Sequence, residues 1–152
     1  MLQEFMGRLG HSFSRPELLK QALTHRGYHF ENKAQSPGHF ERLEFLGDAV
    51  LDMVLSEWLM QSYPDVEEGT LSKWRASLVN EAVLSEMARA MGLGQHLFLG
   101  KSEAAQREQL RPRILASAFE AVIASIYMDG DLPAARRFIQ AEFATKISQL
   151  DT

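Results

Sequence analysis

Four acidic residues recur at helical spacing inside one apolar stretch, and they are the most chemically informative feature of the chain. The stretch is HFERLEFLGDAVLDMVLSEWLM, and the four residues are Glu41, Glu44, Asp48 and Asp52. At about 100° per residue they fall on a stripe roughly 80° wide, so we expect their side chains to stand above one another. Like charges at such spacings weaken a helix by a few tenths of a kcal/mol each. A hard divalent cation such as Mg²⁺, which prefers oxygen ligands, would offset that cost.

A further carboxylate, that of Glu120, lies in the most apolar part of the sequence, RILASAFEAVIASIYM (113–128). An unpaired buried carboxylate costs several kcal/mol or stays protonated, so this residue needs a partner. One interpretation is an ion pair with an arginine, and the other is a metal site completed with Glu44 and Asp48. Small residues would let the two helices approach closely: Ala116, Ser117, Ala118 and Ala121.

The acidic stripe also has a simpler interpretation, as a solvent-exposed helix face. Against it, no Lys or Arg follows Glu44 or Asp48 at i+4, and the other faces of the stretch are largely apolar. Arg42 and Arg75 remain possible counter-charges, but a divalent ion is the better match to a purely acidic row. The histidines His25, His29 and His39 are interpreted as ordinary polar or partly buried residues without a catalytic role.

Composition limits the remaining possibilities. The 152 residues suit one domain with a real core, and the absence of cysteine excludes disulfides and thiolate ligands. No apolar run approaches the roughly 20 residues of a membrane span, and the N-terminus lacks the features of a secretory signal, so we expect a cytoplasmic protein. A net charge of −4 by itself argues against a nucleic-acid binder, but bound divalent ions would add positive charge among the carboxylates.

The hydrophobic spacing predicts an all-α chain with no convincing strand. Ser14 and Glu17 are spaced as a capping box, which predicts a helix running to about His25. Residues 27–38 are predicted to form a loop, and residues 100–112 a polar, basic connection. The other predicted helices are His39–Tyr63, Thr70 or Ser72 to Val79, Glu81–Met91, Arg113–Met128 (ended by Gly130), and one capped by Asp131 that continues to the C-terminus.

The run Glu41-Arg42-Leu43-Glu44-Phe45-Leu46-Gly47-Asp48 resembles the signature octapeptide of ribonuclease III, a family of double-stranded-RNA endonucleases. Three other blocks resemble the family in the same order. They are QALTH (21–25), the block containing Glu68, Gly69, Leu71, Ser72, Arg75, Leu78 and Val79, and the block from ILA (114–116) through Glu120-Ala121 to Asp129-Gly130. Together the four blocks span nearly the whole chain, which is far more specific than any lone motif.

This resemblance implies the ribonuclease III endonuclease-domain fold, a helical bundle that forms a homodimer, across residues 1–152. It implies Mg²⁺, with Mn²⁺ as a possible substitute, and cleavage of double-stranded RNA to 5′-phosphate and 3′-hydroxyl ends during rRNA or mRNA processing. The residue roles implied are metal binding and catalysis for Glu44, Asp48 and Glu120, a place near the scissile phosphate for Glu41 and Glu68, and a dimer-interface knob for Phe45.

The chain departs from the family pattern at three places. Ser117 stands where the family usually has an aspartate, so it either holds a metal-bound water, leaves the enzyme weak or inactive, or marks a local shift of the match. Lys101, Arg107, Arg111 and Arg113 give the 100–113 region a basic character, suited to phosphate contacts or to a solvated loop. Family members usually continue into a double-stranded-RNA-binding domain, which we expect to be absent from this chain, so that it is either the isolated nuclease domain of a longer protein or a naturally short form.

Two other functions remain open. One is a ribonuclease III-like module that binds RNA or dimerises without cutting, which Ser117 favours. The other is a helical metal phosphohydrolase acting on nucleotides. That class normally uses a His–Asp pair among its ligands, and no His-Asp dipeptide occurs here.

Overall fold

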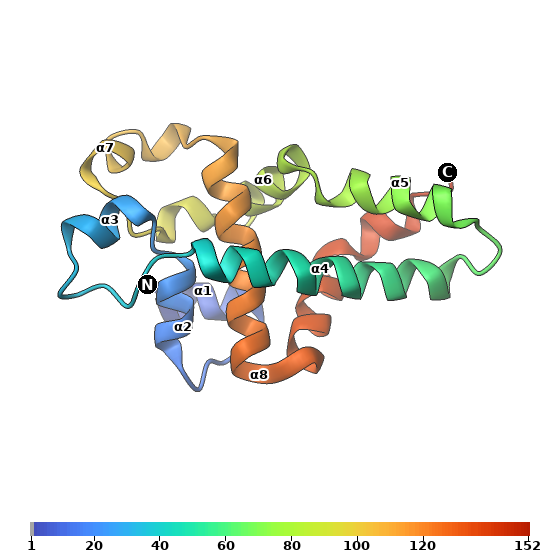
Figure 1. The fold of residues 1–152 in the computed structure, drawn as a ribbon, viewed down its shortest axis with the longest axis horizontal. Coiled ribbons are helices and arrows are strands. Elements are labelled where there is room, and N and C mark those ends of the chain that lie inside the picture. The colour runs from blue at the N-terminus through green and yellow to red at the C-terminus, as the bar shows by residue number, and fades with distance from the viewer. Residues whose placement is uncertain (1) are drawn as a thin grey trace.

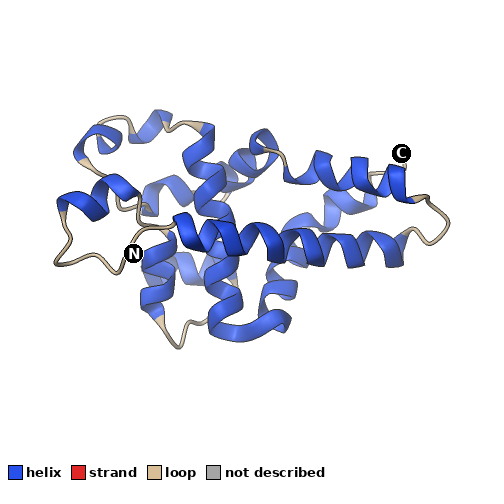
Figure 2. Cartoon of the chain, in the orientation of Figure 1, coloured by secondary structure: helices blue, strands red, loops and turns tan. Residues whose placement is uncertain are grey.

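Two long helices that cross each other organise the chain, which a computed structural model describes for residues 2–152 (Figure 1). They are α4 (Glu41–Ser62) and α8 (Pro112–Ser148), which contact each other most extensively; α2 and α6 pack against α8, and α5 packs against α4. The shorter helices are α1 (Leu2–Leu9), α2 (Pro16–Ala22), α3 (Arg26–Glu31), α5 (Glu68–Val79), α6 (Glu81–Ala90) and α7 (Lys101–Ala104), with two 3₁₀ turns at Leu93–His96 and Arg107–Gln109. Figure 2 shows helices joined by loops, and the single β-bridge within residues 2–152 joins Thr24 to Phe98. The all-α prediction is confirmed.

A glycine sets how closely α4 and α8 approach. A Cβ atom built on Gly47 would lie 1.8 Å from the backbone oxygen of Glu120, far inside any real contact distance. Every larger residue at this position would therefore push the two helices apart. On the α8 side Ala116 and Ser117 are buried and Ala118 and Ala121 fully so, as the predicted close approach requires.

The first part of α8 is the centre of the core. Its residues from Ile114 to Phe119 and from Ala121 to Ile126 are all buried, as expected of the most apolar part of the sequence. The helix breaks at Asp131, whose φ of 62° and ψ of −173° are not helical. The chain turns a corner there and continues toward the C-terminus (Figure 1). The predicted break is confirmed, although Asp131 and not Gly130 adopts the positive φ.

The start of α2 differs from the prediction. The backbone amides of Ser14 and Arg15 donate to the carboxylate of Asp129 at 3.0 and 2.8 Å, and no side chain at the N-cap accepts a hydrogen bond. The capping-box interpretation of Ser14 and Glu17 is therefore wrong. A carboxylate just before the kink of α8 binds the two amides at the start of the helix instead. Burial raises the pKa of Asp129, but hydrogen bonds from His11 and the two amides outweigh it, so the net pKa is lowered.

Other boundaries shift modestly. The fifth helix begins at Glu68, before the predicted Thr70 or Ser72, and short helices α3 and α7 occupy parts of the predicted loop and connection. The helices predicted at 39–63 and 81–91 are confirmed to within two residues at each end. None of the helices in residues 2–152 combines the length and apolar character that a membrane span needs.

Candidate active site

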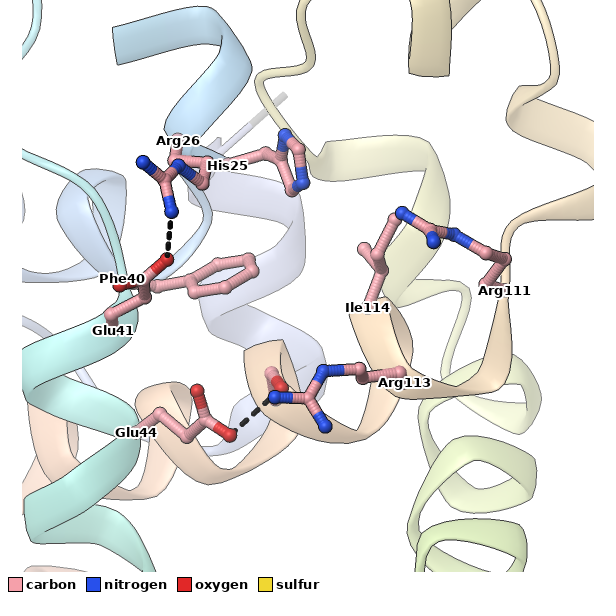
Figure 3. Close-up of a pocket in the computed structure, with 9 residues that line it drawn as sticks. His25, Arg26, Phe40, Glu41, Glu44, Arg111, Arg113 and Ile114 are labelled. Atoms are coloured by element: carbon pink, nitrogen blue, oxygen red, sulfur yellow. Dashed lines mark hydrogen bonds and ion pairs between the residues drawn. The ribbon is translucent and has the colours of Figure 1, made fainter.

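A cavity of about 500 Å³ opens where the starts of α3, α4 and α8 meet (Figure 3). Its wall combines carboxylates, arginines and apolar groups. The residues are His25, Arg26, Phe40, Glu41, Glu44, Arg111, Arg113, Ile114 and Ser117. The cavity therefore reaches Glu44 and Ser117, one on each of the two crossing helices.

Glu44 and Ser117 are in direct contact across the helix crossing. The Ser117 hydroxyl donates to Oε2 of Glu44 at 2.8 Å, and Ser117 is only 7% exposed. A serine hydroxyl has one proton to donate and lone pairs that accept, so a proton given to Glu44 leaves acceptor capacity for a bound water. Ser117 thus orients the carboxylate of Glu44.

Glu120 and Asp48 form the second pair of the site. Burial, a hydrogen bond to the Asp48 side chain and the negative charges of Asp48, Glu44 and Asp52 raise the pKa of Glu120 from 4.5 to about 9. At neutral pH Glu120 is therefore protonated and donates to Asp48. The alternative interpretation, an ion pair between Glu120 and an arginine, is not formed with any of residues 2–152.

Asp52 extends the acidic row one turn further along α4. Burial and the charge of Asp48 raise its pKa, while Arg75 acts in the opposite direction. Its Oδ1 atom is buried and has no hydrogen-bond partner among residues 2–152. Arg75 donates instead to the hydroxyl of Ser56 at 2.7 Å. Within residues 2–152, Glu41 is therefore the only carboxylate of the acidic row that forms an ion pair with an arginine, Arg26.

The donor set suits a hard divalent ion. All its atoms are oxygens, as Mg²⁺ prefers, and a cation would relieve the repulsion that keeps Glu120 protonated. Within the described residues, no three carboxylate or imidazole side chains already converge as a metal site. The side chains form two hydrogen-bonded pairs, Ser117 with Glu44 and Glu120 with Asp48. Metal binding would require Glu120 to lose its proton and turn with Asp48 and Glu44 toward one ion.

The two acidic residues expected near the scissile phosphate lie at different places. Glu41 lines the cavity beside Glu44 and forms an ion pair with Arg26 at 3.5 Å. Glu68 starts α5 and accepts a hydrogen bond from Ser72 at 2.6 Å. It lines a separate groove between α4 and α5, with Met60 and Arg75. Within one chain the structure brings Glu41 to the site and leaves Glu68 outside it.

Phe45 points away from the core. It is 83% exposed, the most exposed large apolar side chain in residues 2–152. Beside it lies a largely apolar cavity of about 650 Å³, lined by residues of α2, α4 and α8 that include Leu18, Leu46 and Met128. A projecting aromatic ring next to an apolar hollow is the geometry expected of a self-complementary interface.

Several residues of the site were not predicted from the sequence. The contact between Gly47 and the backbone of Glu120 was missed, although a glycine one residue before Asp48 was a usable signal. Arg26 was not singled out either. His25, which also lines the cavity, accepts a hydrogen bond from the amide of Gly27 at 3.1 Å and caps α3. Burial lowers its pKa.

Comparisons with known proteins agree on the family. A family model described as ribonuclease-III-like matches residues 15–147. A Ribonuclease 3 from Bdellovibrio bacteriovorus is 50% identical over 136 residues, which is 90% of this chain and 58% of that protein. A Ribonuclease 3 from Nitratiruptor is 44% identical over 89% of this chain and 57% of its own length. The chain thus spans less than two thirds of these relatives.

A solved structure gives the same result. It is the nuclease domain of ribonuclease III from Campylobacter jejuni, described for structural flexibility in a region involved in dimer formation. Its TM-score is 0.83 at 34% sequence identity, and the match covers 95% of this chain and 99% of that one. The likeness therefore extends over the complete helical arrangement described above.

Proposed function

The chain belongs to the ribonuclease-III-like family, and we propose that it is a divalent-metal-dependent endoribonuclease that cleaves double-stranded RNA. One observation carries the proposal. Gly47 lets α4 and α8 touch, and this contact gathers Glu44, Asp48, Ser117 and Glu120 beside a cavity that opens to solvent. A cytoplasmic location suits an enzyme that processes cellular RNA.

We assign metal binding to Glu44, Asp48 and Glu120, with Mg²⁺ as the ion and Mn²⁺ as a substitute. When bound, the ion would supply an activated water and offset the charge of the phosphoryl group. Ser117 holds the carboxylate of Glu44 in place, and its free lone pairs accept a hydrogen bond from a bound water. Glu120 would have to lose its proton to bind the ion, and the positive charge would offset the burial and the repulsion that favour the protonated form.

The other residues of the proposal position the substrate. Glu41 lies at the mouth of the cavity, next to the path of an RNA backbone that reaches Glu44. Glu68 lies in a separate groove of the same chain, so a role at this cavity would need a second copy to deliver it. Double-stranded RNA suits such a surface because its wide minor groove allows recognition by shape and 2′-hydroxyls.

We propose that two copies of the chain associate through Phe45 and the apolar cavity beside it. An aromatic side chain that is 83% exposed is unfavourable in water and gains from entering an apolar hollow on a partner. A symmetric dimer would use this surface twice, because the knob and the hollow lie on the same face of each chain.

Ser117 supports a second candidate, an RNA-binding or dimerisation module that does not cut. The serine supplies no negative charge, so it contributes less to cation binding than an aspartate would. Incubating a labelled RNA duplex with the chain in Mg²⁺ and in EDTA separates the two candidates. The nuclease produces 5′-phosphate and 3′-hydroxyl fragments in Mg²⁺ only, and Glu120→Gln produces none. An intact duplex in both conditions would contradict the nuclease proposal.

A further inference from the structure

The cavity beside the carboxylates has a basic wall. Arg26, Arg111 and Arg113 line it together with only two carboxylates, Glu41 and Glu44. The acidic residues Asp48 and Glu120 lie outside this lining. The site therefore has an acidic part at the helix crossing and a basic part at the start of α8, side by side.

The three arginines differ in how far their charges are already paired. Arg26 pairs with Glu41 at 3.5 Å, and Arg111 reaches Glu103 at 4.0 Å. Arg113 forms no ion pair with any of residues 2–152, although it lines the same cavity as Glu44. In Figure 3 its side chain extends from the start of α8 toward Glu44. Its positive charge is thus available to a ligand in the cavity.

Helix stability does not account for Arg113. The residue lies in the first turn of α8, where the aligned peptide dipoles disfavour a cation. The first turn also contains no acidic residue that would pair with it. Its neighbour Arg111, at the N-cap, adds a second cation to the same place. Packing is no explanation either, because the Arg113 side chain is exposed.

Arg113 and Ser117 are one helical turn apart on the same face of α8, and both line the cavity. The chain therefore has a neutral residue in the acidic part of the site and, four residues earlier, a cation in the basic part. Both features make this site less negative. A less negative site holds a phosphodiester more readily and a divalent ion less readily.

We propose that Arg113 is a phosphate-binding residue that contacts the backbone of the RNA duplex next to the bond held at Glu44. Arg111 supports it from the rim. A guanidinium suits this task because its planar fork donates two parallel hydrogen bonds to phosphate oxygens. The inference rests on the proposed function, since it takes duplex RNA as the ligand.

The experiment measures duplex binding in the Glu120→Gln background, so that cleavage does not interfere. The dissociation constant of a labelled RNA duplex is measured across a KCl series at fixed Mg²⁺ for this parent and for Arg113→Gln, Arg113→Lys and Arg137→Gln. Arg137 is a matched control, because it is also exposed and lies on α8 beyond the kink. Thermal melts of all four proteins check that the fold is retained.

We expect Arg113→Gln to weaken binding several-fold at low salt and to reduce the slope of log K against log[KCl] by about 1 per site. Arg113→Lys retains the slope because it keeps the charge, and Arg137→Gln behaves as the parent. Equal affinities and slopes for Arg113→Gln and Arg137→Gln would overturn the proposal, as would a parent that binds no duplex.

Cleavage by the unmutated chain is scored separately. If the unmutated chain cleaves the duplex but Arg113→Gln has the same salt slope as its parent, the phosphate-binding role of Arg113 is rejected and the nuclease proposal is retained. If Arg113→Gln reduces the salt slope but the unmutated chain does not cleave the duplex, the phosphate-binding role of Arg113 is retained and the nuclease proposal is rejected.

Discussion

The proton held between Glu120 and Asp48 links the site to pH. Because the pKa of Glu120 is raised from 4.5 to about 9, its protonated form is favoured in the folded chain and its ionised form is penalised. The resulting contribution to stability is fully present below pH 4.5 and is lost as the pH rises toward 9. The metal-free protein should therefore become less stable across this window.

Glu120→Gln tests this directly, since glutamine keeps the shape and carries no charge. At pH 8 in EDTA we expect its Tm to exceed that of the unmutated chain by about 3 °C, as for ~1 kcal/mol in a domain of this size. Adding Mg²⁺ should raise the Tm of the unmutated chain more than that of the variant. Differential scanning calorimetry at pH 5 and pH 8 measures both. A variant that is less stable than the unmutated chain in EDTA at pH 8 would contradict the protonation assigned to Glu120.

Ser117→Asp restores a carboxylate at the position that departs from the family. We expect it to lower the Mg²⁺ concentration needed for half-maximal duplex cleavage, because a fourth negative charge strengthens cation binding. Cleavage rates across a Mg²⁺ titration measure the change, and Ser117→Ala is the control that removes the hydroxyl without adding charge. Superimposable titration curves for the unmutated chain and Ser117→Asp would remove Ser117 from the metal site.

At the scale of elements, the crossing of α4 and α8 depends on one missing methyl group. Gly47→Ala would place a Cβ atom 1.8 Å from the backbone oxygen of Glu120, so one helix must move. We expect the free energy of unfolding to fall by about 3 kcal/mol, at the upper end for overpacking, and the Tm to fall by roughly 6–12 °C. Thermal melts measure the effect.

Gly7→Ala is the matched control for this substitution. Gly7 lies within α1, and a Cβ atom there would meet no atom within 4 Å. Alanine at that position should be neutral or slightly stabilising, because it is the better helix former. Similar melting temperatures for the two variants would show that the crossing tolerates the extra group and that the geometry described here is wrong.

The contrast between predicted and missed elements has a physical basis. The helix at 41–62 was predicted because its periodicity is local, and the helix at 113–128 because a continuous apolar run requires burial. The cap of α2 was missed, since Asp129 lies more than a hundred residues away in sequence. The acidic row of α4 was predictable from its spacing and the basic character of Arg111 and Arg113 from their positions in the sequence, whereas Arg26 joins them only because folding brings it to the same cavity.

At the scale of the whole molecule, the proposed dimer depends on the exposed ring of Phe45. Phe45→Ala removes the knob without touching the core, so we expect a folded protein that associates more weakly. The dissociation constant for self-association should rise roughly tenfold or more, as for an aromatic hot spot. Sedimentation equilibrium measures it.

Phe30→Ala is the control, because Phe30 is also an exposed phenylalanine, at 52%, and does not line the cavity beside Phe45. We expect Phe30→Ala to leave the self-association constant unchanged. Equal constants for both variants would place the interface elsewhere on the molecule.

Carboxylates from α4 and α8 are proposed to share one divalent ion, and the nuclease mechanism depends on this. The most direct test is anomalous diffraction from crystals soaked in Mn²⁺. This ion accepts the same oxygen ligands as Mg²⁺, and its anomalous scattering shows where it is bound. We predict an anomalous peak within coordination distance of Glu44, Asp48 and Glu120, and no such peak in crystals of Glu120→Gln. Ordered carboxylates in fully soaked crystals, without a peak between them, would contradict the shared ion.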